Sequence, residues 1–370
     1  MGKRVIIIDY NHLAHTYLNS GYKATKTVVI DGKPKVIDTT IQSGTIKAIH
    51  RWSKGGSNPT AVCFDSPVPA RKAYFAKTFG MAVEGDKAYK AGRAPMRQDM
   101  MEAITMVKDI LVSAGVSVFK GDNYEADDLV FACIQRAKED YPGMPIDVIT
   151  NDADLLPLVD ETVSVFLRSK VMTWAESPDI EKAHYVQVTP ANYQDVIQNL
   201  SAYRKFLVPY NSILLHKILR GDSSDNIKAV KEIKGMFPPK KYNAIIEELI
   251  DNDVPLSKLF RYGKNKETLV SIKTGEEVGP DHDRSDLAIR YDDPQELEDM
   301  INTLCWYIED EEVLTFIKKM YRGMNLNQAY AGLGSISRRP AKLQKINTFN
   351  EGVLQSKLVP LGINLRLNVY

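Results

Sequence analysis

The sequence predicts an α/β protein built on a mostly parallel, Rossmann-like sheet with flanking helices. Short, continuous apolar runs indicate buried strands, which we place at 4–8, 60–64, 116–119, 146–150 and 163–167. Segments with helical spacing alternate with these runs, at 41–52, 98–114 and 125–138. Strands that alternate with helices favour a parallel sheet with right-handed crossovers.

Each expected element follows from its own residues. The run Val-Ile-Ile-Ile in the first strand is too short and too uniformly apolar for a surface helix. In 98–114, apolar residues recur at helical spacing, so we expect one buried side carrying Met101, Ile104, Val107, Ile110 and Leu111.

The apolar pattern becomes mostly helical after about residue 195, at 212–220, 241–250, 296–308 and 311–321. We therefore expect an α/β domain at 1–195, a helical domain at 196–335 and a C-terminal tail at 336–370. The polar stretch 261–295 is predicted to be a long loop or a small irregular insert.

Composition is that of an ordinary globular protein: 370 residues, 44% hydrophobic and 26% charged. A net charge of +1 marks no global nucleic-acid binder, so any such binding must come from local patches. Three widely spaced cysteines make no disulfide framework, and no apolar run approaches membrane-spanning length. We expect a cytoplasmic, reduced protein with no membrane partner.

Acidic residues fall in five short clusters, three of which directly follow an apolar run. An aspartate after a strand is often only a helix cap, and each cluster alone is weak. Ligands bind at the carboxyl ends of strands in open α/β sheets, and crowded carboxylates call for hard cations. The set therefore predicts a two-metal site for phosphodiester hydrolysis, formed by Asp9, Asp65, Glu125, Asp127, Asp128, Asp152, Asp154, Asp222 and Asp225.

Five stretches, in this order, resemble the 5′-nuclease superfamily, and the phage ribonuclease H type most of all. They are Ile-Ile-Asp-Tyr-Asn at 7–11, Val-Cys-Phe-Asp-Ser at 62–66, Tyr-Glu-Ala-Asp-Asp-Leu at 124–129, Thr-Asn-Asp-Ala-Asp-Leu-Leu-Pro-Leu at 150–158 and Ile-Leu-Arg-Gly-Asp-Ser-Ser-Asp-Asn-Ile at 218–227. The resemblance implies a PIN-like α/β nuclease domain followed by a helical duplex-binding domain. It does not cover the insert or the tail.

By matching position, the resemblance implies two groups of metal ligands. The first metal, Mg²⁺ with Mn²⁺ as a substitute, falls to Asp9, Asp65, Glu125, Asp127 and Asp152. The second falls to Asp152, Asp154, Asp222 and Asp225, while Asp128 matches an extra acid of bacterial and phage members. The ions would supply an attacking hydroxide and stabilise the leaving oxygen, so no histidine base is needed.

Basic and aromatic residues are interleaved at 71–97, which alone is typical of a solvated helix face. The resemblance implies an arch or gateway there that holds a 5′ single strand. Lys90 or Arg93 would then reach the scissile phosphate, as catalytic residues beside Asp152. The expected nucleic-acid contacts there are Arg71, Lys72, Tyr89, Lys90 and Arg93.

A second basic stretch lies where the family has a helix-hairpin-helix. Here the hairpin is degenerate, because Lys-Ala-Val-Lys-Glu-Ile-Lys follows Asn-Ile and only Gly235 remains. That puts the family's K⁺ site in doubt, and duplex contacts are predicted at Lys228, Lys231 and Lys234.

These features together predict a Mg²⁺-dependent 5′-to-3′ exonuclease and flap endonuclease with ribonuclease H-type activity. Expected substrates are flaps, nicked or gapped duplex and RNA–DNA hybrids, cut by a monomer during primer removal in replication. The tail is a candidate contact for a sliding clamp or a single-strand binding protein. Alternatives are a PIN-type ribonuclease and a non-catalytic, structure-specific DNA-binding protein. A haloacid-dehalogenase phosphatase is disfavoured because position 11 is Asn rather than Asp.

Overall fold

The structure is a computed structural model that describes most of the first 168 residues, two shorter segments further along the chain and scattered residues between them. It describes 2–168 except 20, 67–69, 81–88, 91–95 and 122, and then 185–200. Near the C-terminus it describes 344–363 and 365. Between these parts it describes 203, 205–206, 213–222, 225–228, 239–240, 242–243, 260–262, 269–271, 277–278, 315 and 319–320.

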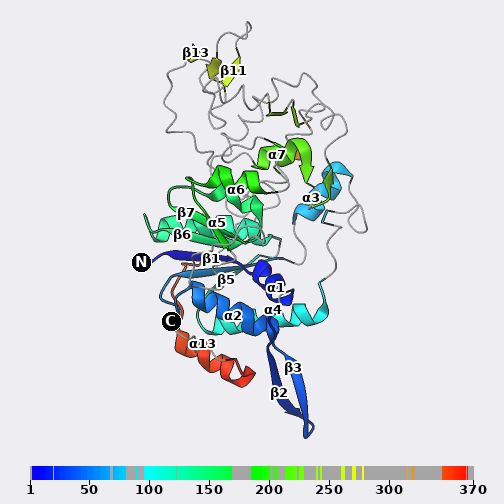
Figure 1. The fold of residues 1–370 in the computed structure, drawn as a ribbon, viewed down its shortest axis with the longest axis vertical. Coiled ribbons are helices and arrows are strands. Elements are labelled where there is room, and N and C mark those ends of the chain that lie inside the picture. The colour runs from blue at the N-terminus through cyan, green and yellow to red at the C-terminus, as the bar shows by residue number, and fades with distance from the viewer. Residues whose placement is uncertain are drawn as a thin grey trace.

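A six-stranded sheet forms the centre of the molecule (Figure 1). The strands are β1 (Val5–Asp9), β4 (Thr60–Phe64), β5 (Ser117–Lys120), β6 (Ile146–Thr150), β7 (Val163–Arg168) and β8 (Tyr185–Val188). Their order across the sheet is β5-β4-β1-β6-β7-β8. The first five are parallel, as predicted, whereas β8 is an antiparallel edge strand that the sequence pattern did not indicate.

Helices cover both faces of this sheet, which gives three layers (Figure 1). On one face lie α1 (Tyr10–Leu18), α2 (Thr40–Trp52) and α4 (Gln98–Ser113), and on the other lies α5 (Ala126–Asp140). Side chains alternate along a strand, so Ile6 and Ile8 of β1 point into the α2–α4 layer and share one buried core with it. The predicted α/β fold with flanking helices is confirmed.

The buried side of α4 differs from the expected one by part of a turn. Met101, predicted to be buried, has 42% of its surface exposed, while the neighbouring Met100 is 1% exposed. The buried stripe is formed by Met100, Ala103, Val107, Ile110 and Leu111. Periodicity alone left two adjacent methionines to choose from, and tertiary packing selected Met100.

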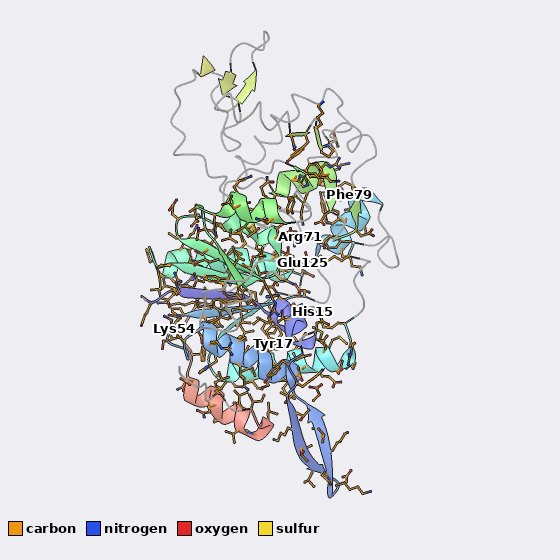
Figure 2. All side chains as sticks on the ribbon, in the orientation of Figure 1. His15, Tyr17, Lys54, Arg71, Phe79 and Glu125 are labelled. Atoms are coloured by element: carbon orange, nitrogen blue, oxygen red, sulfur yellow. The ribbon has the colours of Figure 1, made fainter. Side chains whose placement is uncertain are left out.

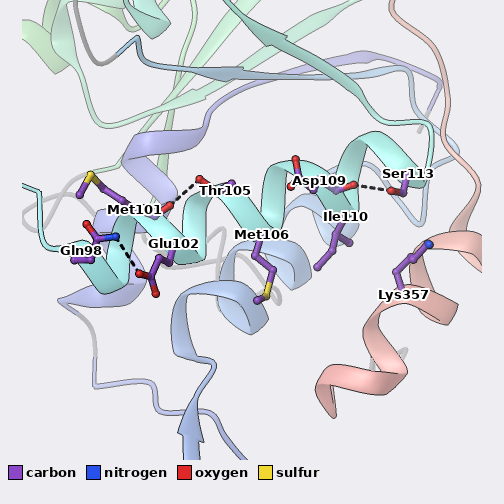
Figure 3. Close-up of a pocket in the computed structure, with 9 residues that line it drawn as sticks. All are labelled: Gln98, Met101, Glu102, Thr105, Met106, Asp109, Ile110, Ser113 and Lys357. Atoms are coloured by element: carbon purple, nitrogen blue, oxygen red, sulfur yellow. Dashed lines mark hydrogen bonds between the residues drawn. The ribbon is translucent and has the colours of Figure 1, made fainter.

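The C-terminal segment, expected as a separate tail, packs onto the α/β domain. Its helix α13 (Glu351–Leu358) lies beside α4, and Leu354 and Leu358 are fully buried in the common core. The imidazole Nε2 of His50 on α2 lies 2.8 Å from the carboxylate of Glu351. An open groove of about 670 Å³ remains between α4 and Lys357 of α13 (Figure 3), and no predicted acidic site residue lines it.

A β-ribbon between α1 and α2 was not predicted. It consists of β2 (Thr25–Ile30) and β3 (Lys33–Asp38), and it projects away from the helical layer (Figure 1). Its two turn residues, Asp31 and Gly32, have φ angles of 52° and 72°, as a type I′ turn requires. The dipeptide Asp-Gly between two β-branched runs was therefore a local signal that could have revealed this hairpin.

The remaining described elements are short. They are α3 (Ala70–Phe79), η1 (Ala153–Leu158), α6 (Tyr193–Asn199), α7 (Ile213–Arg220), β9 (Gly221–Asp222), β10 (Ile227–Lys228), β11 (Phe260–Tyr262), β12 (Leu269–Ser271), β13 (Glu277–Val278) and η6 (Val359–Leu361). Three of them, β11 to β13, form a small antiparallel sheet that begins at Phe260 and continues into 261–295, the stretch expected to be a long loop or a small irregular insert. The helix predicted at 296–308 lies outside the described residues, as do most residues of the helices predicted at 241–250 and 311–321. Within the part that is described, no helix is long and apolar enough to span a membrane.

Candidate functional site

The sheet reverses its winding direction at β1. From β1 the chain builds β4 and then β5 on one side, and it then crosses to add β6 and β7 on the other. Such a switch point leaves a crevice at the carboxyl ends of the two central strands, which is where ligands of open α/β sheets bind.

Three predicted carboxylates lie at this edge of the sheet. Asp9 ends β1 and is paired with Cys63 of β4, and Asp65 directly follows β4. Asp152 follows β6, the strand on the other side of β1. Because neighbouring strands are about 4.8 Å apart, the backbones of these three residues span roughly 10 Å.

Local hydrogen bonds hold these carboxylates. Asp9 is 6% exposed and accepts a bond from the Thr150 hydroxyl at 3.0 Å. Asp65 accepts one bond from the Asn11 side chain and one from the backbone N–H of Ala126, both at 2.6 Å. Asp152 caps the 3₁₀ helix η1 by accepting a bond from the backbone N–H of Asp154 at 2.9 Å. The same three carboxylates thus accept local hydrogen bonds and lie crowded together at one edge of the sheet.

The first turn of α5 adds Glu125, Asp127 and Asp128. Glu125 is the N-cap and Asp128 the third helical residue of a capping box, so their spacing is set by the helix end itself. Both are buried, with 5% and 2% of their surface exposed. Burial raises the pKa of Asp127, and repulsion from Asp152 and Asp9 raises it further.

Arg71 lies in a different environment from the one predicted. It is 5% exposed, and its guanidinium donates to Glu125 at 2.5 Å and to both oxygens of Asp128. Figure 2 labels Arg71 next to Glu125. Most of its N–H donors are directed at these two carboxylates, and its burial keeps it away from a phosphate at the surface. We therefore assign Arg71 to neutralising two buried carboxylates rather than to nucleic-acid contact.

Tyr89 also differs from the expected base-stacking role. Its ring is 6% exposed and stacks on Phe75 with centroids 5.0 Å apart. Its hydroxyl lies 3.2 Å from Glu125 and 3.1 Å from Asp225. The ring and the hydroxyl of Tyr89 are therefore both engaged within the protein.

Lys90 connects the predicted arch to the acidic cluster. Its ammonium group donates to Glu125 and lies 3.8 Å from Asp225, and its backbone N–H donates to the Asp225 carbonyl at 2.9 Å. Its φ angle of 58° is uncommon for a residue with a side chain. The side chain keeps 18% of its surface exposed, so Lys90 reaches both the carboxylates and solvent.

Lys217 is a site residue that sequence analysis did not single out. From α7 it donates to Asp154 and Asp222, each at 2.5 Å, and its side chain is only 11% exposed. Burial lowers its pKa, but attraction to Asp154 and Asp222 outweighs burial and raises the pKa overall. The sequence signal for this role was the position of Lys217 five residues before Asp222. Lys217 lies on α7, which leads directly into β9, where Asp222 lies.

The electrostatics of the cluster are those of crowded acids. Burial, with added repulsion from Asp65 and Asp152, raises the pKa of Asp9 to about 7. Burial and repulsion from Asp152 also raise the pKa of Asp154 to about 7, against the attraction of Lys217. Glu125 shows the opposite balance, since Arg71 and Lys90 outweigh burial and lower its pKa to about 2.

The donor set fits hard divalent cations, although the side chains are not arranged as a finished metal site. Among the described residues, no three acidic, histidine or cysteine side chains form a ready coordination sphere. Arg71, Lys90 and Lys217 instead draw several carboxylates toward themselves. Nine carboxylates face three basic groups, however, and repulsion still raises the pKa of Asp9, Asp127 and Asp154. An excess of oxygen ligands and negative charge is what Mg²⁺-type ions require.

Two of the other predicted nucleic-acid contacts are among the described residues. Lys72 is partly exposed on α3, and Lys228 pairs with Gly221 through its backbone in the β9–β10 ladder. Arg93, Lys231 and Lys234 lie outside the described residues.

Fold and site together define the class of this protein: an α/β protein with an acidic site at the switch point of its sheet. A family model described as 5′-3′ exonuclease, N-terminal resolvase-like domain, matches residues 4–185, which include seven of the nine acids. Residues 4–185 therefore belong to the 5′-3′ exonuclease N-terminal domain family, in agreement with the resemblance to the 5′-nuclease superfamily.

Curated relatives support the same family. A 5′-3′ exonuclease of Mycoplasma genitalium is 24% identical over 303 residues, covering 77% of this chain and 90% of that protein. The thermostable DNA polymerase I of Thermus filiformis is 27% identical over 231 residues, or 62% of this chain. The match takes up only 22% of that polymerase, so this chain spans a small part of its length.

Solved structures that match this chain include the T5 D15 protein co-crystallised with metal ions. It is 15% identical with a TM-score of 0.45, and the match covers 86% of this chain and 99% of that one. The catalytic core of Rad2 in complex with DNA substrate has 12% identity and a TM-score of 0.44, over 98% and 88% of the two chains.

Proposed function

We propose that this chain is a divalent-metal-dependent 5′-nuclease that hydrolyses phosphodiester bonds of DNA and of RNA–DNA hybrids. One observation carries the proposal: carboxylates from β1, β4, α5 and β6 meet at the switch point of the sheet, within the region that the exonuclease family model matches. Mutually repelling carboxylates that burial keeps together need cations to remain ionised at neutral pH.

Two groups of carboxylates would hold two Mg²⁺ ions. The first group is Asp9, Asp65, Glu125, Asp127 and Asp152, and the second is Asp152, Asp154, Asp222 and Asp225, with Asp128 beside them. When bound, such ions activate water for attack and stabilise charge on the phosphate and the leaving oxygen.

The residues of the chain have three further tasks in this proposal. Arg71 keeps Glu125 and Asp128 ionised and fixed at the start of α5. Lys217 holds Asp154 and Asp222 together until ions replace its charge. Lys90 leaves the carboxylates to contact the scissile phosphate, since its ammonium is partly exposed and its partners then bind metal.

Flaps, nicked or gapped duplexes and primer hybrids are the proposed substrates, with primer removal in replication as the task. The decisive experiment uses flap, nick and RNA–DNA hybrid substrates labelled at the 5′ or the 3′ end, with and without Mg²⁺. We expect short 5′-end products that require the ion. Undiminished cleavage in excess chelator would contradict the proposal.

Two variants sharpen this experiment. Asp152→Asn is expected to abolish cleavage while retaining junction binding, because it removes a shared ligand and no phosphate contact. The matched control Asp109→Asn removes an acid from the outer face of α4, where Asp109 is 68% exposed, and should cleave normally. Lys90→Ala should lower the single-turnover rate more than the affinity; an unchanged rate would exclude the proposed phosphate contact.

A further inference from the structure

The β2–β3 ribbon has one cationic face. In its antiparallel register, Lys26 pairs with Ile37 and Val28 pairs with Lys35. Side chains two residues apart share a face, so Lys33 lies on the same face as Lys35, and Lys35 lies beside Lys26. The other face carries Thr27 opposite Val36 and Val29 opposite Pro34, and it is uncharged until Asp38 at the base.

The charge on this face is available for binding. Lys33 and Lys35 are exposed, and neither they nor Lys26 forms an ion pair within the described residues. The acids of the ribbon lie elsewhere: Asp31 is in the turn, and Asp38 caps Thr40 through a 2.8 Å bond to its backbone N–H. Positive side chains spaced along one face of a two-stranded ribbon complement a line of phosphates.

The base of the ribbon is braced, so the lysines stand on a preorganised element. The Thr39 N–H donates to the Ala24 carbonyl at 2.8 Å, and the Tyr22 hydroxyl lies 2.9 Å from that of Ser43 on α2. The aliphatic stem of Lys26 packs closely against Gly362, which follows α13. Ordering costs on binding are therefore low for this element.

The ribbon lies within reach of DNA that occupies the acidic site. Asp9 is the N-cap of α1, whose nine residues span about 13 Å, and the ribbon follows α1 in the chain. Tyr22, just before β2, stacks edge-to-face on Tyr17 of α1 with centroids 5.7 Å apart. Six-residue strands add about 20 Å, so the tip lies within about 40 Å of Asp9, roughly one turn of B-DNA.

We propose that the cationic face of the β2–β3 ribbon is a second DNA-binding site, which contacts the phosphates of one duplex arm about one helical turn from the cleaved bond. The contact is independent of sequence, because lysines meet phosphates rather than base edges. The identity of the ligand rests on the nuclease function proposed above. The ribbon sets the duplex length that the enzyme prefers, whereas the acidic site sets the chemistry.

The test measures binding of the full chain to nicked duplexes in Ca²⁺ buffer, with each arm shortened separately from about 16 to about 6 base pairs, the shorter arm being too short to span one turn. Lys33→Ala/Lys35→Ala should weaken binding only when the contacted arm is long. Loss of two phosphate contacts should make the slope of log affinity against log salt shallower by about 2. Between about 50 and 200 mM salt, the wild type should then lose about tenfold more affinity than the variant.

Two matched variants control for total charge. Lys3→Ala/Lys357→Ala removes two exposed lysines away from the ribbon and should behave as the wild type, and Lys33→Arg/Lys35→Arg should restore binding. Equal salt slopes, an effect independent of arm length, or the same loss in the control pair would each overturn the proposal. Arm-dependent binding without Mg²⁺-dependent cleavage would leave the ribbon site standing and refute the nuclease. Cleavage without any ribbon effect would do the reverse.

Discussion

Replacing Arg71 by Met is the most informative single perturbation of this protein. Methionine has a similar aliphatic length but no charge, so Glu125 and Asp128 would remain buried without their common partner. Breaking a buried ion pair from one side leaves an uncompensated charge, which is far more costly than removing both partners.

The magnitude follows from the pKa of Glu125. In the folded protein this pKa lies at about 2, against 4.5 for the free side chain, although burial alone raises it. One pKa unit corresponds to about 1.4 kcal/mol, so the pairing of Glu125 contributes about 3 kcal/mol above pH 5. Lys90 supplies part of this, and Arg71 also stabilises ionised Asp128, whose pKa is about 6. We expect Arg71→Met to lower the free energy of unfolding by about 3 kcal/mol at pH 8.

The pH dependence gives the result a sign. A carboxylate with a depressed pKa stabilises the fold above its unfolded pKa, and this stability is lost as the pH falls through the folded value. Without Arg71, both carboxyls take up protons more readily in the folded state. The destabilisation should therefore be largest at pH 8 and clearly smaller near pH 4.

Urea unfolding followed by circular dichroism, in chelator and at both pH values, measures this difference. Arg71→Lys is the matched control, because it retains one charge but cannot bridge two carboxylates with a planar fork, and it should lose about half as much. A loss below about 1 kcal/mol at pH 8, or a loss equal at both pH values, would refute the assignment of Arg71 as the partner of buried ionised acids.

Three further outcomes follow from the site. Asp152→Asn should raise the free energy of unfolding in chelator by about 1 kcal/mol at pH 8, because it relieves the repulsion that Asp152 exerts on Asp9 and Asp154. The gain should vanish near pH 5, where Asp9 and Asp154 are both protonated. A destabilised variant at pH 8 would contradict this expectation. Mg²⁺ should raise the melting temperature more at pH 8 than at pH 6, because the ion must displace protons from Asp9 and Asp154, whose pKa values are about 7. Calorimetry of Mg²⁺ binding in two buffers should detect this proton release. Binding without proton release would exclude Asp9 and Asp154 as ligands. Lys217→Met should lower the free energy of unfolding in chelator by about 3 kcal/mol, because it leaves Asp154 and Asp222 unpaired. Mg²⁺ should restore part of this loss. If Mg²⁺ restores none of it, the ion does not bind between Asp154 and Asp222.

The sheet and the acidic cluster were largely predictable, for a local reason. Continuous apolar runs mark buried parallel strands wherever they occur, and residues after such strands reach the same edge of the sheet. Asp9, Asp65 and Asp152 could thus be placed together from their neighbours in the chain alone. Their role as metal ligands remains a prediction.

The partners of these acids could not be predicted in the same way. Helical periodicity indicates which side of a segment is buried, but it does not indicate what that side meets. Arg71 looked like a phosphate contact and Lys217 like one basic residue among several, until packing placed each between two carboxylates.

The amino-acid sequence by itself determined the class of fold, the order of the strands along the chain and the family of motifs at the carboxyl edge, because each depends on residues close together in the chain. Only the tertiary structure decided that α13 returns to the α4 layer, that lysines gather on one face of the ribbon, and that three basic side chains neutralise part of the acidic cluster. These features depend on contacts between residues distant in sequence. Burial and charge pairing stabilise such contacts only once the chain has folded, so a local sequence pattern does not reveal them.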